Sequence, residues 1–147
     1  MTRFFFAAAR PLVVGLMVAA AGCGGGGPPV AQVGGVVSLD GKPLPDIRVL
    51  FQPENKDPSS SGMGSFALTD SEGKYVLKLT DTQREGAIVG KHRITLGDKR
   101  SEDAQDSDAG DIGKSPKSRV PARYTKEPLV IEVNPGNNLT NIELTSK

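Results

Sequence analysis

From Val33 onward, apolar and polar residues alternate in short segments that are separated by turn residues. Ile47, Val49 and Phe51 alternate with Arg48 and Gln52 in one such segment. A period of two places successive side chains on opposite faces of a β-strand, so that one face of each strand can be buried. Many short strands with turn signals at short intervals are typical of a sandwich or barrel. The sequence therefore predicts an all-β domain.

The alternating segments predict strands over the following ranges: Val33–Leu39, Ile47–Gln52, Phe66–Thr69, Tyr75–Leu79, Gly90–Leu96, Leu129–Val133 and Leu139–Leu144. Asp40-Gly41 is a strong signal for a tight turn. Asp70 to Gly73 is expected to close a hairpin, and the turn at Pro135–Asn137 is expected to close a second one at the C-terminal end. The pattern contains no segment that predicts a helix.

Two polar segments interrupt the strands. Pro53–Gly64 is rich in Pro, Ser and Gly and is predicted to be a loop. Asp98–Ser118 is strongly charged and has one large apolar residue, Ile112. Because such a composition cannot bury enough apolar surface to order a chain, we expect 98–118 to be a disordered charged loop.

The first 22 residues are typical of a secretory signal peptide. Arg3 and Arg10 give a positive start, and the uncharged run Pro11–Ala21 follows. Its length suits a signal-peptide core and is too short to cross a bilayer. A longer span that begins at Phe4 would place Arg10 near its middle, which disfavours a transmembrane helix.

The apolar run ends in Ala20-Ala21-Gly22-Cys23, which resembles a bacterial lipobox. The resemblance implies cleavage between Gly22 and Cys23, followed by acylation of Cys23. Ala20 departs from the usual Leu at that position. The alternative is ordinary cleavage after Ala21, which would leave Cys23 as a free thiol.

Acylation of this kind implies a diacylglycerol and often a further chain such as palmitate. Because two or more chains hold a protein firmly to a membrane, we expect a stable anchor in the cell envelope. Residues 23–32, rich in Gly and Pro, then form a tether, and 33–145 form the domain on the periplasmic or extracellular side. Gly24 stands where an Asp retains some lipoproteins at the inner membrane, which slightly favours the outer membrane.

Four short motifs occur in order along the domain: Gly35–Leu44, Thr69–Tyr75, Gly90–Ile94, and the pair Pro121–Tyr124 with Val133–Gly136. Together they resemble the carboxypeptidase regulatory-like domains of bacterial lipoproteins. The resemblance implies a seven-stranded Greek-key sandwich of the transthyretin-like (prealbumin-like) or Ig-like kind. It also implies an accessory module without catalytic activity or cofactor.

The sequence offers few groups for catalysis. The chain has one histidine and one cysteine, so it can form no internal disulfide. His92 falls on the inward face of a predicted strand, where we expect a buried structural ring. The alternative is that His92 acts as a general base, which would favour a hydrolase function. A general base needs a nucleophile or an orienting acid nearby. Asp106, Asp108 and Asp111 are a weak calcium candidate, because Lys117 stands where a calcium loop has its bidentate Glu.

The charge of the chain indicates no polyanionic partner. The formal net charge is +1, and the two signal-peptide arginines contribute more than that excess. No basic face with aromatic residues is visible, so nucleic-acid binding is not expected. We expect a structural or protein-interaction module with an unidentified envelope partner. The alternative is a glycan- or peptide-binding module, although the chain has no Trp and few aromatic residues for a stacking platform.

Overall fold

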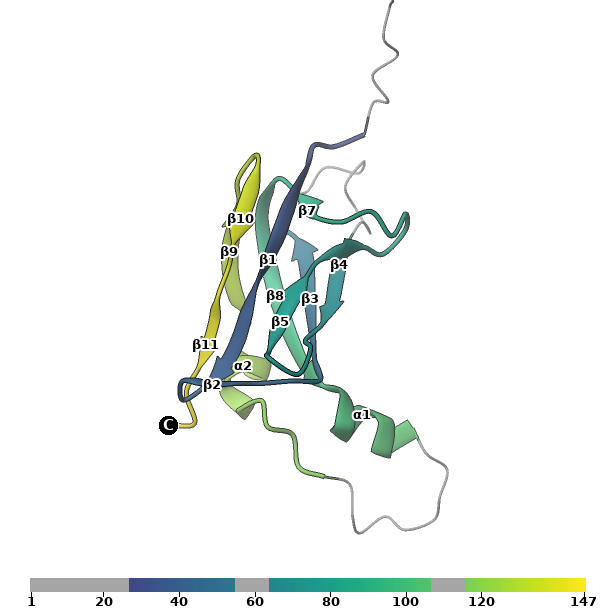
Figure 1. The fold of residues 1–147 in the computed structure, drawn as a ribbon. Coiled ribbons are helices and arrows are strands. Elements are labelled where there is room, and N and C mark those ends of the chain that lie inside the picture. The colour runs from purple at the N-terminus through teal and green to yellow at the C-terminus, as the bar shows by residue number, and fades with distance from the viewer. Residues whose placement is uncertain (1–26, 55–63, 107–115) are drawn as a thin grey trace, which may run out of the picture.

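The computed structural model describes residues 27–54, 64–106 and 116–147. Two β-sheets pack face to face around one core, and two short helices lie together at one end of the sandwich (Figure 1). The prediction of an all-β domain is confirmed.

The chain forms its elements in the following order: β1 (Val30–Leu39), β2 (Lys42–Pro43), β3 (Ile47–Pro53), β4 (Ser65–Leu68), β5 (Lys74–Val76), β6 (Lys78–Leu79), β7 (Ala87–Ile88), β8 (Gly90–Asp98), α1 (Lys99–Asp106), α2 (Ala122–Lys126), β9 (Leu129–Val133), β10 (Asn137–Leu139) and β11 (Ile142–Leu144).

One sheet is antiparallel and has the strand order β6-β4-β3-β8-β9. Strand β3 lies at its centre and pairs with β4 on one side and β8 on the other. Its inward side chains are Ile47, Val49 and Phe51, which are fully buried as the alternation predicts. Burial of three large apolar side chains on one strand supplies several kcal/mol, at about 25 cal/mol per Å² of apolar surface.

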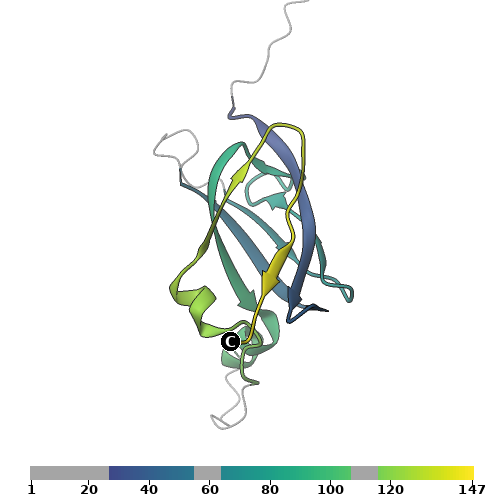
Figure 2. The same ribbon diagram turned by 90° about the vertical axis from the view of Figure 1, so that its left-hand side faces the viewer.

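The other sheet is built around β1. Strands β2, β5 and β7 pair with β1 in antiparallel fashion, and β10 and β11 pair with it in parallel. Ser38 has Pro43 on one side and Glu143 on the other, so the early strands and the C-terminal strands occupy opposite edges of β1. Figure 2 shows the C-terminal segment running beside β1 for most of its length.

Strand β1 begins earlier than the alternation predicts. Val30 pairs with Ile88, and the Gln32 N–H donates to the Gly136 carbonyl over 3.1 Å. Residues 30–32, assigned to the tether from the sequence, are therefore part of the sheet.

The turn at Asp40-Gly41 forms as predicted. Asp40 has a φ of 50° and Gly41 a φ of 78°. Two consecutive residues with positive φ are the signature of a type I′ hairpin turn, which matches the twist of the strands that it joins. This turn returns the chain from β1 to β2.

Of the two other predicted hairpins, the first forms in part and the second is wrong. The Asp70–Gly73 turn does form, since Asp70 Oδ1 accepts the N–H groups of Glu72 and Lys74, each over 2.9 Å. Strand β4 pairs in antiparallel fashion with β6, the second half of the predicted strand Tyr75–Leu79, whereas the first half, β5, pairs with β1 in the other sheet. By contrast, the two strands of the predicted C-terminal hairpin do not pair with each other, since β9 pairs with β8 and β10 pairs with β1. Each turn carries the chain across the core, because a turn motif sets the local backbone path and not the strand that is paired next.

The prediction that the chain has no helix is also wrong. Lys99–Asp106 form α1 within the segment assigned to a disordered loop, while 107–115 lie outside the described residues. Helix α1 has no apolar stripe, so its period cannot be read from hydrophobicity. Its first turn is held by polar contacts: Asp98 Oδ1 accepts the Arg100 N–H over 3.3 Å, and Arg48 pairs with Glu102 at 3.0 Å.

A close backbone contact joins the first and last strands. A Cβ added to Gly35 would lie 1.9 Å from the carbonyl oxygen of Thr140, which lies between β10 and β11. The buried Tyr75 hydroxyl donates to the same oxygen over 2.7 Å. Only a glycine at position 35 allows this approach, so the junction depends on the absence of a side chain.

Candidate functional site

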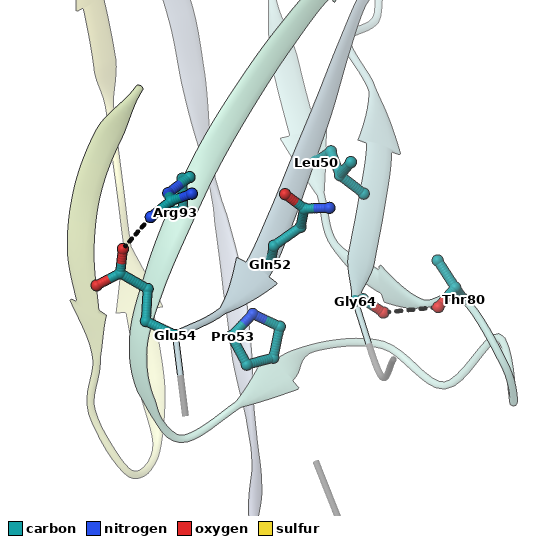
Figure 3. Close-up of a pocket in the computed structure, with 7 residues that line it drawn as sticks. All are labelled: Leu50, Gln52, Pro53, Glu54, Gly64, Thr80 and Arg93. Atoms are coloured by element: carbon teal, nitrogen blue, oxygen red, sulfur yellow. Dashed lines mark hydrogen bonds and ion pairs between the residues drawn. The ribbon is translucent and has the colours of Figure 1, made fainter. Parts of the chain in front are cut away.

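A pocket of about 710 Å³ opens on the outer face of the five-stranded sheet. We call it the outer pocket. It is lined by Leu50, Gln52, Pro53, Glu54, Gly64, Thr80 and Arg93, and Figure 3 shows these residues around the end of β3. Its volume is within the range of small-molecule sites, about 300–1,000 Å³.

The register of β3 and β8 brings the polar side chains of the outer pocket together. Gln52 and Arg93 are direct partners across the two strands. The Arg93 guanidinium also pairs with the carboxylate of Glu54, with Nη2 and Oε1 separated by 3.2 Å. Side chains of direct cross-strand partners on one face lie close together. An amide, a guanidinium and a carboxylate therefore stand next to one another.

The opposite wall of the outer pocket comes from the segment after β6. The N–H and the hydroxyl of Thr80 both donate to the Gly64 carbonyl, each over 2.9 Å. These bonds hold Thr80 next to the start of β4, across from Gln52 in Figure 3. Leu50 and Pro53 add apolar surface. The outer pocket thus combines hydrogen-bond donors, acceptors and an apolar patch, which is the composition of a binding site for a polar organic ligand.

His92 is fully buried between the sheets. Its Nε2 lies 2.6 Å from the carbonyl oxygen of Ile88, and its ring packs against Phe51 with 5.8 Å between centroids. Because a carbonyl oxygen only accepts, Nε2 carries the proton. Nδ1 has no hydrogen-bond partner among the described residues. His92 is the buried structural ring that the strand pattern favours, and it has no access to a substrate.

Burial makes the charged form of His92 unfavourable and lowers its pKa below the ordinary value of 6.5. The folded chain thus holds a neutral ring, whereas the unfolded chain protonates near pH 6.5. The stability contributed by the neutral ring is present above that pH and is lost as the pH falls toward the folded-state pKa.

We therefore expect the free energy of unfolding to fall below about pH 6.5, by at most about 1.4 kcal/mol per pH unit for one proton. No other histidine titrates in this range. Urea denaturation from about pH 7.5 to pH 5 measures the slope, and His92→Phe should flatten it. An equal slope in both proteins would contradict the assignment.

A buried ion pair between Asp98 and Arg119 joins the two ends of the segment that contains α1. Arg119 binds Asp98 with Nε to Oδ2 and Nη2 to Oδ1, each at 2.8 Å, and its backbone N–H donates to Oδ2 over 2.9 Å. Nη2 also donates to the Pro45 carbonyl over 2.8 Å. These hydrogen bonds hold the pKa of Asp98 down, at about 2. We call this pair the clasp; it lies at the end of β8, far from the outer pocket.

The sequence-predicted site residues lie mostly outside the described part of the chain. Gly22, Cys23, Asp108 and Asp111 are not described, and Asp106 is the last residue of α1. In the ranges that the structure does describe, no three His, Cys, Asp or Glu side chains gather to hold a metal ion. No helix within those ranges has the length and apolar character needed to span a membrane.

The residues of the outer pocket were missed by the sequence analysis. Alternation did place Gln52 on the outward face of its strand. The convergence of Gln52, Glu54 and Arg93 depends on the pairing of β3 with β8, which lie far apart in the sequence. The clasp was missed for the same reason, since Asp98 and Arg119 are separated by a charged segment that looked unstructured.

Comparison of the chain with protein-family models, curated proteins and solved structures found no match.

Proposed function

We propose that this chain is a membrane-anchored, non-enzymatic lipoprotein of the cell envelope, whose β-sandwich is a structural or protein-interaction module. The observation that carries the proposal is the short segment between Cys23 and Val30, where β1 begins. Even when fully extended, this segment reaches at most about 25 Å, at roughly 3.5 Å per residue. An acylated Cys23 would thus hold the sandwich close to the lipid surface, for which the outer membrane is the preferred candidate.

The anchor would also orient the sandwich. Strand β1 has 10 residues and spans about 33 Å, at 3.3 Å per residue. The start of β1 lies at one end of the molecule, and α1 and α2 lie at the other (Figure 1). The clasp belongs to the same end as the helices, because Asp98 is the last residue of β8 and directly precedes α1. In an anchored protein the end with the helices points away from the membrane. This end is therefore the surface that we propose for an envelope protein partner.

A role without catalysis is supported by the position of His92. A general base must reach the proton that it removes, and the Nε2 of His92 is bound to the Ile88 carbonyl inside the core. Asp98, another buried titratable side chain, has both carboxylate oxygens bonded to Arg119. The hydrogen bonds of both side chains are thus used to stabilise the fold.

We further propose that the domain is a carboxypeptidase regulatory-like domain with a seven-stranded Greek-key sandwich. The turns at Asp40-Gly41 and Asp70–Gly73 and the buried Tyr75 support this, because they are the residues that carry the resemblance. Strands β10 and β11 follow each other along one edge of β1, and β2, β5 and β7 line the other. Several of these short strands therefore share one position beside β1, so the sheet has fewer strand positions than it has short strands.

Replacement of Cys23 by alanine tests the anchor. Cells grown with a labelled fatty acid should incorporate label into the unchanged protein and place it in the membrane fraction. Cys23→Ala should lose the label and leave the membrane fraction, since no other cysteine is present to be acylated.

Gly27→Ala is the matched control for this experiment. It changes the same short segment, and its added Cβ would meet no atom within 4 Å. It should keep both the label and the membrane location. The proposal is wrong if Cys23→Ala retains them too.

A second candidate function is ligand binding. The outer pocket favours it, because three polar side chains of different chemistry converge there beside apolar Leu50 and Pro53. A glycan or a peptide of the envelope are the two ligand classes to compare.

A further inference from the structure

We propose that the outer pocket binds a neutral saccharide, which contacts Gln52, Glu54 and Arg93. This inference rests on the second candidate function, ligand binding, and names its ligand class. It is independent of the anchor at Cys23.

The charge of the outer pocket favours a neutral ligand. Arg93 and Glu54 are the two charged residues among its described lining, and they pair with each other at 3.2 Å. Their opposite charges cancel, so a charged ligand would have to compete with one member of the pair for the other. A neutral ligand can bind while the pair stays closed.

The hydrogen-bonding groups suit hydroxyls. The guanidinium of Arg93 has five N–H donors, and one contact to Glu54 leaves others to point elsewhere. The Glu54 carboxylate has a second oxygen that accepts, and the Gln52 amide both donates and accepts. A hydroxyl also does both. Three adjacent planar groups with mixed donors and acceptors can therefore form hydrogen bonds with several neighbouring hydroxyls at once.

The position of the outer pocket disfavours an extended peptide. Strand β3 pairs with β8 along its whole length and with β4 from Arg48 to Phe51, so most of its backbone groups are already used within the sheet. A peptide that binds by adding a strand needs a free strand edge. A ligand in the outer pocket meets the face of the sheet and is recognised by side chains. This arrangement fits a saccharide better than a peptide backbone.

The apolar part of the outer pocket is small, and this sets the expected affinity. Leu50 and Pro53 can contact the C–H face of a sugar ring, and half-buried Phe66 is the cross-strand partner of Leu50. None of the described lining residues is aromatic. Because stacking on an aromatic ring is missing there, we expect weak binding, with a Kd on the order of 1 mM.

Titration of the isotope-labelled full chain in detergent solution tests the proposal by NMR. The probes are neutral oligomers of glucose and of N-acetylglucosamine, with a neutral peptide of similar size as a comparison. A saccharide should shift the amide signals of Gln52, Thr80 and Arg93 in a saturable way. Gln52→Ala and Arg93→Ala should each weaken binding about tenfold, as loss of about 1.4 kcal/mol would.

Arg48→Ala is the matched control. Arg48 lies on the outer face of the same strand and pairs with Glu102 at 3.0 Å, with exposure similar to that of Arg93. It does not line the outer pocket, so this variant should bind as the unchanged chain does. No saturable shift at tens of millimolar saccharide, or shifts caused by the peptide alone, would overturn the proposal.

The anchor does not affect this result. Detergent solution suits an acylated and a free chain equally, and Cys23→Ala should bind the saccharide with unchanged affinity. Loss of saccharide binding with an intact anchor would overturn the inference alone. Loss of the anchor with intact binding would overturn the proposed lipoprotein alone.

Discussion

We expect Gly35→Ala to lower the free energy of unfolding by about 3 kcal/mol or more. The new Cβ would lie 1.9 Å from the carbonyl oxygen of Thr140 and 2.5 Å from its carbonyl carbon. Both atoms belong to backbone, which is held by a 2.8 Å bond from the Thr140 N–H to Gly34 and by the Tyr75 hydroxyl. The clash can be relieved only by moving the last strands away from β1. Urea denaturation measures the change.

Gly27→Ala is the control for Gly35→Ala as well. It makes the same chemical change at an exposed position where the added Cβ meets nothing within 4 Å. We expect a change of less than about 0.5 kcal/mol, as for most surface substitutions. If the two variants were equally stable, the close approach of Thr140 to Gly35 would not exist in solution.

The second large effect is expected for Asp98→Ala, which should destabilise the protein by about 3 kcal/mol. Asp98 is 2% exposed, and it satisfies two guanidinium nitrogens and one backbone N–H of Arg119. Removing one partner of a buried pair leaves the other charge without compensation, and this costs about 3–5 kcal/mol. The side chain of Arg119 is 22% exposed, so water can solvate part of it and the lower end of that range applies.

Arg48→Ala provides the comparison for the clasp. The pair of Arg48 with Glu102 also ties the segment containing α1 to the sheet, but both side chains are largely exposed. Surface pairs contribute about 0–1 kcal/mol. A loss for Asp98→Ala as small as that for Arg48→Ala would show that the clasp does not hold the fold together.

The same clasp sets a pH dependence. The pKa of Asp98 is about 2 in the fold, against 3.8 when free, because its carboxylate is bonded to Arg119. The stability from this carboxylate is therefore fully present above about pH 4 and is lost as the pH falls toward 2. The Asp98→Ala protein should therefore not show this loss of unfolding free energy between about pH 4 and pH 2.

Several features of this protein could be predicted from local sequence alone. The inward positions of Ile47, Val49 and Phe51 follow from alternation, because a strand must send successive side chains to opposite faces. The turn at Asp40-Gly41 follows from the low energetic penalty of positive φ at Asp and Gly. The strand assignment and the burial of His92 needed no knowledge of the rest of the chain.

Other features needed the tertiary structure. The predicted C-terminal hairpin does not form, and the hairpin at Asp70–Gly73 forms only between β4 and β6, because alternation defines which face of a strand is buried and says nothing about its neighbour. The outer pocket and the clasp each join residues that only strand pairing brings together: Gln52 with Arg93, and Asp98 with Arg119. Helix α1 was missed because polar contacts to Asp98 and Arg48 hold it, and these leave no hydrophobic period to detect.

The alternating pattern from Val33 onward thus determined by itself that the domain is all-β in class and which side chains of a strand such as β3 enter the core. Only the tertiary structure decided which strands are neighbours, that the first and last strands lie side by side, and where polar groups converge. The physical reason is that burial of a side chain depends on its own polarity and on the face of the strand from which it projects. The choice of neighbour depends on how all strands together satisfy their backbone hydrogen bonds around one core.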